Sequence, residues 1–235
     1  MSKRKIILSV LLFIIMFALV IAGKFFLDNK HYYISAVVLM LLAAVPFFIK
    51  FGKKNVGARE LTVMASIAAA AVASRAAFYA LPQVKPMCAV IIIAASAFGG
   101  ETGFMLGALS VFLSNFIFGQ GSWTPFQMFG MALTAYLCGK LFYKTKLGKN
   151  KIAVSLLGGA ICFAVYGFIV DLSSVFMMSA DYSLKSVLAI FASGAPFNLI
   201  HGATTAVLLF IGYDPIMEKL ERVRIKYALF GEKYE

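Results

Sequence analysis

Hydrophobic residues run along the chain in segments long enough to cross a membrane, and short polar or basic breaks separate them. A bilayer core about 30 Å thick takes roughly 20 apolar residues per helix, and the runs lack the alternation of β-barrel strands. The pattern predicts an all-α integral membrane protein with about eight transmembrane helices. We expect these helices at 6–22, 31–49, 60–80, 84–98, 103–118, 125–142, 152–177 and 185–211.

Composition strengthens this interpretation and leaves no room for a separate soluble domain. The 235 residues are 62% hydrophobic, whereas soluble domains are typically about half apolar. We expect a hairpin over 1–57, a six-helix core over 58–212 and a basic tail over 213–235. The first helix has the outline of a cleavable signal peptide, but a second apolar segment follows it directly, so a transmembrane hairpin is the simpler interpretation.

The basic residues predict an orientation. They gather at 3–5, 50–59, 140–151 and 219–233. In the expected topology these four segments all lie on one side of the membrane, whereas the other side has only single lysines at 24, 30, 85 and 185. Cytoplasmic segments are the basic ones, so we expect both termini in the cytoplasm. The net charge of +12 then reflects topology, and nucleic acid is excluded as a partner.

The basic tail is expected to form its own helix. Asp214 is a residue type that starts helices and Pro215 suits the first helical position. Apolar residues then recur at helical spacing with Arg222, Arg224 and Lys226 between them. This pattern favours an amphipathic helix on the inner leaflet of the lipid bilayer, and a frayed tail is the alternative.

Polar side chains inside the apolar segments are candidates for a binding site, because they are costly in a membrane unless they face a cavity or each other. Arg75 and Asp171 are expected at matching depths, either as an ion pair or facing one pocket. Asn198 and His201 share a helix face, where the histidine contacts a ligand or makes an interhelical hydrogen bond. The predicted substrate-binding residues are Arg75, Lys85, Asn115, Gln120, Trp123, Gln127, Asp171, Asn198 and His201.

Small residues predict where helices approach closely. A stripe on the third helix comprises Ala65, Ala69, Ala73 and Ala77, and Gly99, Gly103 and Gly107 repeat the spacing at the fifth. Packing inside the bundle accounts for either stripe. Four alanines in a row also suit the interface with a partner subunit, which we expect at the alanine stripe.

No enzyme signature is present. The sequence has no phosphate-binding loop of the form GxxxxGK[ST], no HExxH and no GxSxG. Cys88, Cys138 and Cys162 sit singly in apolar runs without metal-ligand spacing and are expected to be small core residues. We therefore expect no catalytic residues, no metal and no cofactor.

Several motifs together resemble a transporter family. These are the alanine-rich helix from Ala58, RAAFYALPQVKP (75–86), the glycines of 99–107, SNFIFGQGSWTPFQM (114–128) and APFNLIHG (195–202). From Ala58 onward the chain resembles the substrate-binding (S) component of energy-coupling factor (ECF) transporters, the vitamin importers of bacteria and archaea. The expected hairpin departs from that family's usual six helices.

The resemblance implies a vitamin-like substrate in an outward-facing pocket of a prokaryotic plasma-membrane protein. It also implies docking of the alanine stripe on a transmembrane coupling subunit, which two separate ATP-binding subunits drive. Among cargoes, a corrinoid ranks narrowly first, followed by a queuosine-type precursor or another vitamin. The rival functions are a stand-alone proton-coupled transporter with Arg75, Asp171 and His201 as its relay, and a membrane enzyme.

Overall fold

The computed structural model describes residues 57–178 and 183–231, and these residues form helices and connecting turns without any strand. The all-α expectation is confirmed for this part of the chain. The expected hairpin helices at 6–22 and 31–49 lie outside the described residues, so the total of eight helices is not confirmed.

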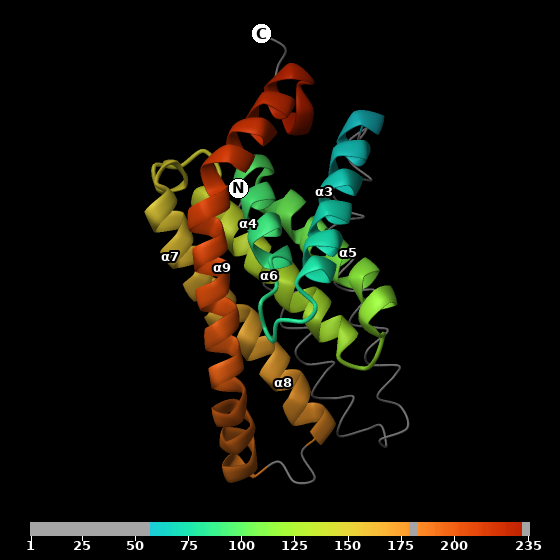
Figure 1. Ribbon diagram of the computed structural model, residues 1–235, viewed down its shortest axis with the longest axis vertical. Coiled ribbons are helices and arrows are strands. Elements are labelled where there is room, and N and C mark those ends of the chain that lie inside the picture. Colours follow the sequence, from blue (N-terminus) through green and yellow to red (C-terminus); the bar gives the residue numbers. More distant parts are fainter. Residues whose placement is uncertain (1–56, 179–182, 232–235) are drawn as a thin grey trace, which may run out of the picture.

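The described helices form one bundle (Figure 1). Three segments run on without a break as a single 28-residue helix from Lys151 to Met178, so the bundle has six helical rods. The elements are α3 (Ala58–Ala77), α4 (Met87–Phe98), α5 (Gly100–Phe118), α6 (Thr124–Phe142), η2 (Leu147–Lys149), α7 (Lys151–Ile161), the π-helix η3 (Cys162–Tyr166), α8 (Gly167–Met178), α9 (Leu184–Lys226) and η4 (Leu229–Gly231).

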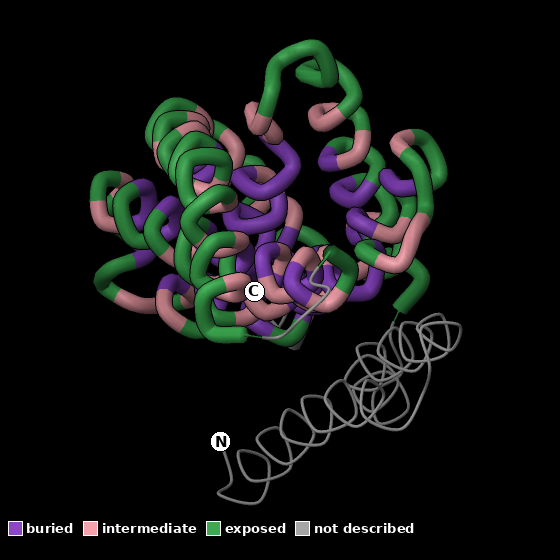
Figure 2. The backbone as a smooth tube through the Cα atoms, turned by 90° about the horizontal axis from the view of Figure 1, so that it is seen from below, coloured by how far each residue is buried: buried purple, intermediate pink, exposed green. Residues whose placement is uncertain are grey.

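Four of these rods are long and apolar enough to cross a membrane: α3, α5, the rod from α7 to α8, and α9. Helix α4 is shorter than expected, because it begins at Met87 after Pro86 rather than at Val84. Its 12 residues give a length of about 18 Å, which is less than the bilayer core. All its residues except Val90 are buried, and it packs against α3, α5, α6 and α9. Buried residues line the inner sides of the helices (Figure 2).

Glycines set the close packing of α5 against its neighbours. Gly99 alone separates α4 from α5, with the positive φ of 93° that glycine tolerates best. A Cβ atom at Gly103 would lie 2.5 Å from the Cβ of Ala95 and 2.9 Å from the Ala135 carbonyl oxygen, and one at Gly107 would lie 2.8 Å from the Cα of Ala132. The glycine stripe therefore serves packing inside the bundle.

Helix α9 corrects the expected division at residue 211. It continues unbroken for 43 residues with Pro196 and Pro215 inside it, a length of about 65 Å. Asp214 does not cap a new helix; its Oδ2 lies 3.3 Å from Nζ of Lys151. The sequence signal failed because an Asp-Pro pair suits a helix start as well as an exposed turn of a continuing helix.

The end of α9 also corrects the expected position of the tail. Arg224 is buried and donates to the carbonyl oxygen of Ala97 at the end of α4, at 2.5 Å. The Phe230 ring lies 4.7 Å from the ring of Phe98, and its backbone N–H donates to Glu60 in α3. Ile216 and Leu220 pack against the same core. The apolar face of this segment thus covers the bundle instead of lying freely on a lipid surface.

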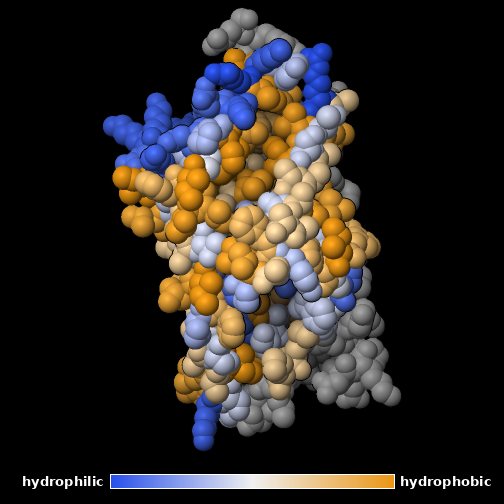
Figure 3. Space-filling model, viewed as in Figure 1, coloured by the Kyte–Doolittle hydropathy of each residue, from blue (hydrophilic) through white to orange (hydrophobic). Residues whose placement is uncertain are grey.

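The two ends of the bundle differ in character. Hydrophilic residues gather at the upper end of the view, where α3 begins and α9 ends (Figure 3). We call this the basic end, because Lys140, Lys144, Lys149, Lys219 and Arg222 lie in the segments there. The connections 78–86 and 119–123 lie at the opposite end (Figure 1), which we call the loop end.

The Gly103 contact predicts a measurable stability effect. Gly103→Ala adds a methyl group where Ala95 and the α6 backbone leave no space, and overpacking of this kind costs about 1–3 kcal/mol. We expect a lower melting temperature in detergent than for the parent protein. Gly212→Ala in α9 is the matched control, since its added Cβ would meet nothing closer than 3.4 Å. Equal melting temperatures for both variants would contradict the packing described above.

Candidate functional site

A network of hydrogen bonds centred on Asn115 joins three helices at the loop end. Arg75 of α3 donates from Nη1 to the hydroxyl of Ser114 and to Oδ1 of Asn115, the latter at 2.9 Å. The Asn115 amide donates onward to Thr124 Oγ1 at 3.1 Å and Gln127 Oε1 at 3.0 Å, both in α6. Asn115 is 1% exposed, so each of its polar atoms is satisfied inside the protein.

Aromatic rings surround this network. The Arg75 guanidinium lies over the ring of Phe118, 4.5 Å from its centroid, and the Tyr79 ring stacks on the same Phe118 ring with a centroid distance of 5.4 Å. Trp123 lies against Gly121, where an added Cβ would come within 2.5 Å of the indole. Gly121 also donates its backbone N–H to Thr124. The connection between α5 and α6 is therefore shaped by contacts with the network.

Two of the predicted residues lie at the edge of this group. Gln120 is exposed and donates from Nε2 to the carbonyl oxygen of Phe112 at 3.1 Å. Lys85 lies in the connection between α3 and α4 and contacts Gln83, with Nζ 3.3 Å from Oε1. Burial lowers the pKa of Lys85, and the nearby charge of Arg75 lowers it further. The positive charges of Lys85 and Arg75 therefore lie near each other.

Asp171 belongs to a different contact. Its Oδ2 accepts a hydrogen bond from Nδ2 of Asn198 at 2.7 Å, which joins α8 to α9. The two helices pack closely here, since a Cβ at Gly194 would fall 2.2 Å from the Asp171 carboxylate. Among the ion pairs of residues 57–178 and 183–231, none joins Arg75 to Asp171. The ion-pair alternative is therefore wrong.

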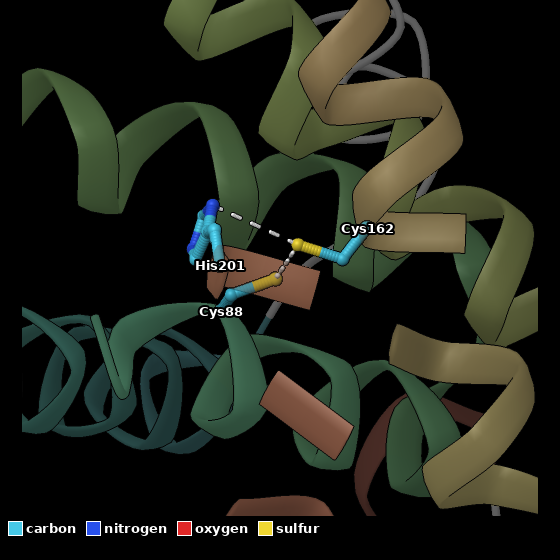
Figure 4. Close-up of side chains that lie close together, drawn as sticks. All are labelled: Cys88, Cys162 and His201. Atoms are coloured by element: carbon cyan, nitrogen blue, oxygen red, sulfur yellow. Dashed lines mark hydrogen bonds between the residues drawn. The ribbon is translucent and has the colours of Figure 1, made fainter. Parts of the chain in front are cut away.

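His201 lies deeper, with sulfur atoms as neighbours. Its Nδ1 is 3.9 Å from Sγ of Cys162, which in turn accepts from the thiol of Cys88 at 3.4 Å. The three side chains point toward one another from α9, η3 and α4 (Figure 4). All three cysteines are buried in the core, as expected, but Cys88 and Cys162 lie together with His201, and Cys138 lies outside this group.

Tyr166 interacts both with Arg75 of the Asn115 network and with His201 of the cysteine cluster. Its ring meets the His201 ring edge-on at 5.2 Å, and it lies close enough to Arg75 for an electrostatic interaction. Lys85 interacts in the same way with Cys162. In the lower half of Figure 3 the surface is hollowed, and blue and pale blue atoms lie among orange ones there. A ring contact and electrostatic interactions thus link Arg75, Lys85, Tyr166 and His201 to one another.

The alanine stripe of α3 lies outside this region. Ala65, Ala69, Ala73 and Ala77 are exposed, whereas Met64, Ile67, Ala68 and Ala71 form the buried face of the helix. No described residue covers the stripe.

A comparison with protein families identifies the class of molecule. The model of the family "ECF-type riboflavin transporter, S component" matches residues 55–215, which is more than half of the chain. The chain belongs to this family. Among curated proteins and among solved structures, no significant match is found. The match confirms the resemblance to ECF S components, which are membrane transport subunits that bind a substrate and not a family of enzymes.

Sequence reasoning found some members of the hydrogen-bond network and missed others. Arg75, Asn115 and Gln127 were predicted and do meet. Ser114, Thr124 and Tyr166 were not singled out, because hydroxyl residues in apolar helices commonly bond their own backbone. The position of Ser114 beside Asn115 was the available signal, since both lie opposite Arg75.

Proposed function

We propose that this chain is the substrate-capture subunit of an ECF-type importer and that its cargo is a heteroaromatic vitamin bound at the loop end. The contacts that link Arg75, Lys85, Tyr166 and His201 inside the bundle support the proposal. Polar groups gathered inside a membrane bundle are expensive, and a bound polar cargo repays that cost. The basic end faces the cytoplasm in this proposal, so the loop end faces outward.

The chemistry of the site suits a neutral ring system with a hydroxyl-bearing chain. Tyr79, Phe118 and Trp123 offer ring faces at the rim, and offset stacking of aromatic pairs adds about 0.5–1.5 kcal/mol each. Arg75, Lys85 and Gln127 offer donors and acceptors for hydroxyl and amide groups. The name of the family points to riboflavin, which has both parts. We therefore rank riboflavin before a corrinoid and before a queuosine-type precursor.

Coupling to ATP requires partners, because the sequence has no phosphate-binding loop of its own. We propose that the exposed alanine stripe of α3 docks on a transmembrane coupling subunit, which two ATP-binding subunits drive. Small residues let a partner helix approach closely. The stripe lies on α3, the same helix that supplies Arg75 to the site. The proposed docking surface and part of the proposed cargo site are therefore on one helix.

The stand-alone proton-coupled transporter is the second candidate, and the contacts disfavour it. Its proposed relay residues are separated: Arg75 bonds Ser114 and Asn115, Asp171 bonds Asn198, and His201 contacts Cys162. In the part of the chain that the structure describes, no hydrogen bond links any two of the three. Uptake in a host without an ECF ATPase module would favour this candidate.

Replacement of Arg75 or Trp123 tests the location of the site. Arg75→Ala removes charge-assisted hydrogen bonds that contribute about 1.5–3 kcal/mol, so we expect cargo affinity to fall roughly 10- to 100-fold. We expect about a tenfold loss for Trp123→Ala. Calorimetry with the purified protein measures both. Arg59→Ala is the matched control, because Arg59 is exposed at the other end of α3. Parental affinity in both site variants would refute the assignment.

Light absorption by the purified protein identifies the cargo. A flavin is yellow and fluorescent, whereas a corrinoid is red and not fluorescent, and a scavenging subunit with nanomolar affinity should retain either during purification from its native host. We expect flavin absorption, with quenching of Trp123, the single tryptophan. A red protein would overturn the ranking. Colourless protein that binds neither compound in calorimetry would remove both cargoes.

Ala69→Trp separates capture from docking. The bulky side chain on the exposed stripe blocks close approach of a partner helix but lies away from the hydrogen-bond network. We expect loss of transport and of co-purification with the coupling subunit, with unchanged cargo affinity. Ala160→Trp, at an exposed alanine of α7, is the matched control and should keep both. Normal co-purification of the Ala69 variant would contradict docking through the stripe.

A further inference from the structure

The cluster of Cys88, Cys162 and His201 is not explained by cargo capture alone. All three residues are nearly inaccessible, with exposed fractions of 0%, 1% and 3%. They come from three different elements, α4, η3 and α9, and their potential ligand atoms all lie within 4.8 Å of one another. Two thiols and an imidazole are the donors that zinc and other thiophilic metals prefer.

The spacing of these atoms fits a metal ion. Bonds of about 2.3 Å to sulfur and 2.0–2.1 Å to nitrogen, at tetrahedral angles, put ligand atoms about 3.6–3.8 Å apart. The observed separations are 3.4 Å between the two sulfur atoms and 3.9 Å between Cys162 Sγ and His201 Nδ1. These two edges differ from the tetrahedral values by a few tenths of an ångström, and the third edge, between Cys88 and His201, is at most 4.8 Å, so a modest contraction would bring all three atoms to bonding distance of one ion.

Cys162 has a hydroxyl group beside its sulfur atom. Thr205 donates from Oγ1 to Cys162 Sγ at 3.6 Å. The Nε2 atom of His201 is buried and has no hydrogen-bond partner among the described residues. A buried polar atom without a partner is costly, so this imidazole is a candidate to bind a ligand.

Charge balance selects the kind of ion. Two thiolates and a neutral imidazole carry a charge of −2, so a divalent cation gives a neutral site, and a neutral site avoids the cost of burying net charge. We propose that Cys88, Cys162 and His201 form a buried binding site for a divalent thiophilic metal ion, with Zn²⁺ as its natural occupant. Binding displaces one proton from each cysteine thiol, so two protons leave and affinity rises with pH.

Three protein ligands leave a fourth position, as in zinc sites that accept a water or another molecule. The ion would lie beside Tyr166, whose ring contacts His201. It would therefore connect α4, η3 and α9, and through His201 it would share one residue with the group that we assign to capture. The site stands independently of which cargo the protein takes.

Metal binding by the full chain tests this proposal. The protein is purified in detergent with a reductant and a histidine-free affinity tag, stripped with a chelator, and titrated with Zn²⁺ against a competing chelator. We expect one Zn²⁺ per chain by elemental analysis, affinity that rises with pH, and, with Co²⁺ as a substitute, the absorption bands of a tetrahedral thiolate site.

Variants locate the site and control for folding. Cys88→Ser, Cys162→Ser and His201→Gln should each weaken Zn²⁺ binding by more than about 100-fold. Loss of a residue that only hydrogen-bonds to a metal ligand weakens binding by at most about 100-fold, so a larger effect marks a ligand. Cys138→Ser is the matched control, because Cys138 is buried on α6 outside the cluster, and it should bind as the parent does. Melting curves check that each variant folds.

Three results would overturn the proposal. The first is a parent protein that binds well under one equivalent of Zn²⁺ and gives no thiolate bands with Co²⁺. The second is an equal loss of binding in Cys138→Ser. The third is a Cys88–Cys162 disulfide, found by mass spectrometry of the non-reduced protein, in a chain that binds no metal after reduction.

Discussion

The hydrogen bonds of Asn115 hold the loop end of the bundle together. In an apolar environment a buried amide has few alternatives to the partners that the protein supplies, and Asn115 uses Arg75, Thr124 and Gln127. These partners come from α3 and α6, so one side chain of α5 fixes the positions of three helices. The guanidinium of Arg75 is thereby oriented beside Phe118. Shape and polarity at the loop end both depend on this residue.

The basic end is held by a different kind of interaction. There, Gly100 and Gly139 approach so closely that a Cβ at Gly139 would fall 2.6 Å from the Cα of Gly100, and dispersion between backbones adds to polar contacts such as the Lys140–Glu101 ion pair. Arg224 adds a hydrogen bond to the end of α4. Close packing suits an end that stays fixed, whereas polar bonds that a cargo can exchange suit an end that binds. The division of the bundle into a packed end and a polar end therefore matches its proposed function.

The sequence predicted the elements whose signals are local. The helix expected at 125–142 is observed at Thr124–Phe142, because Pro125 marks its start and the apolar run ends with a basic segment. The π-helix at Cys162–Tyr166 has no such mark. Cys88 and Cys162 are 74 residues apart in the chain, and only the tertiary fold of the bundle brings them together. The contact between Asn115 and Gln127, 12 residues apart, could be anticipated from the sequence, whereas the contact between Cys88 and Cys162 could not.

The short length of α4 connects these observations. A helix of about 18 Å cannot reach both membrane surfaces, so other residues must fill the space beyond its first residue, Met87. At the loop end this space is bordered by the connection 78–86, which carries Lys85, and by Tyr166 of the π-helix, whose extra residue per turn shifts the side chains of that rod. At the basic end Arg224 and Phe230 cover the last turn of α4. Helix α4 is thus closed at one end by α9 and bordered at the other by polar and charged groups, and this difference between its ends supports the proposal that a cargo binds at the loop end.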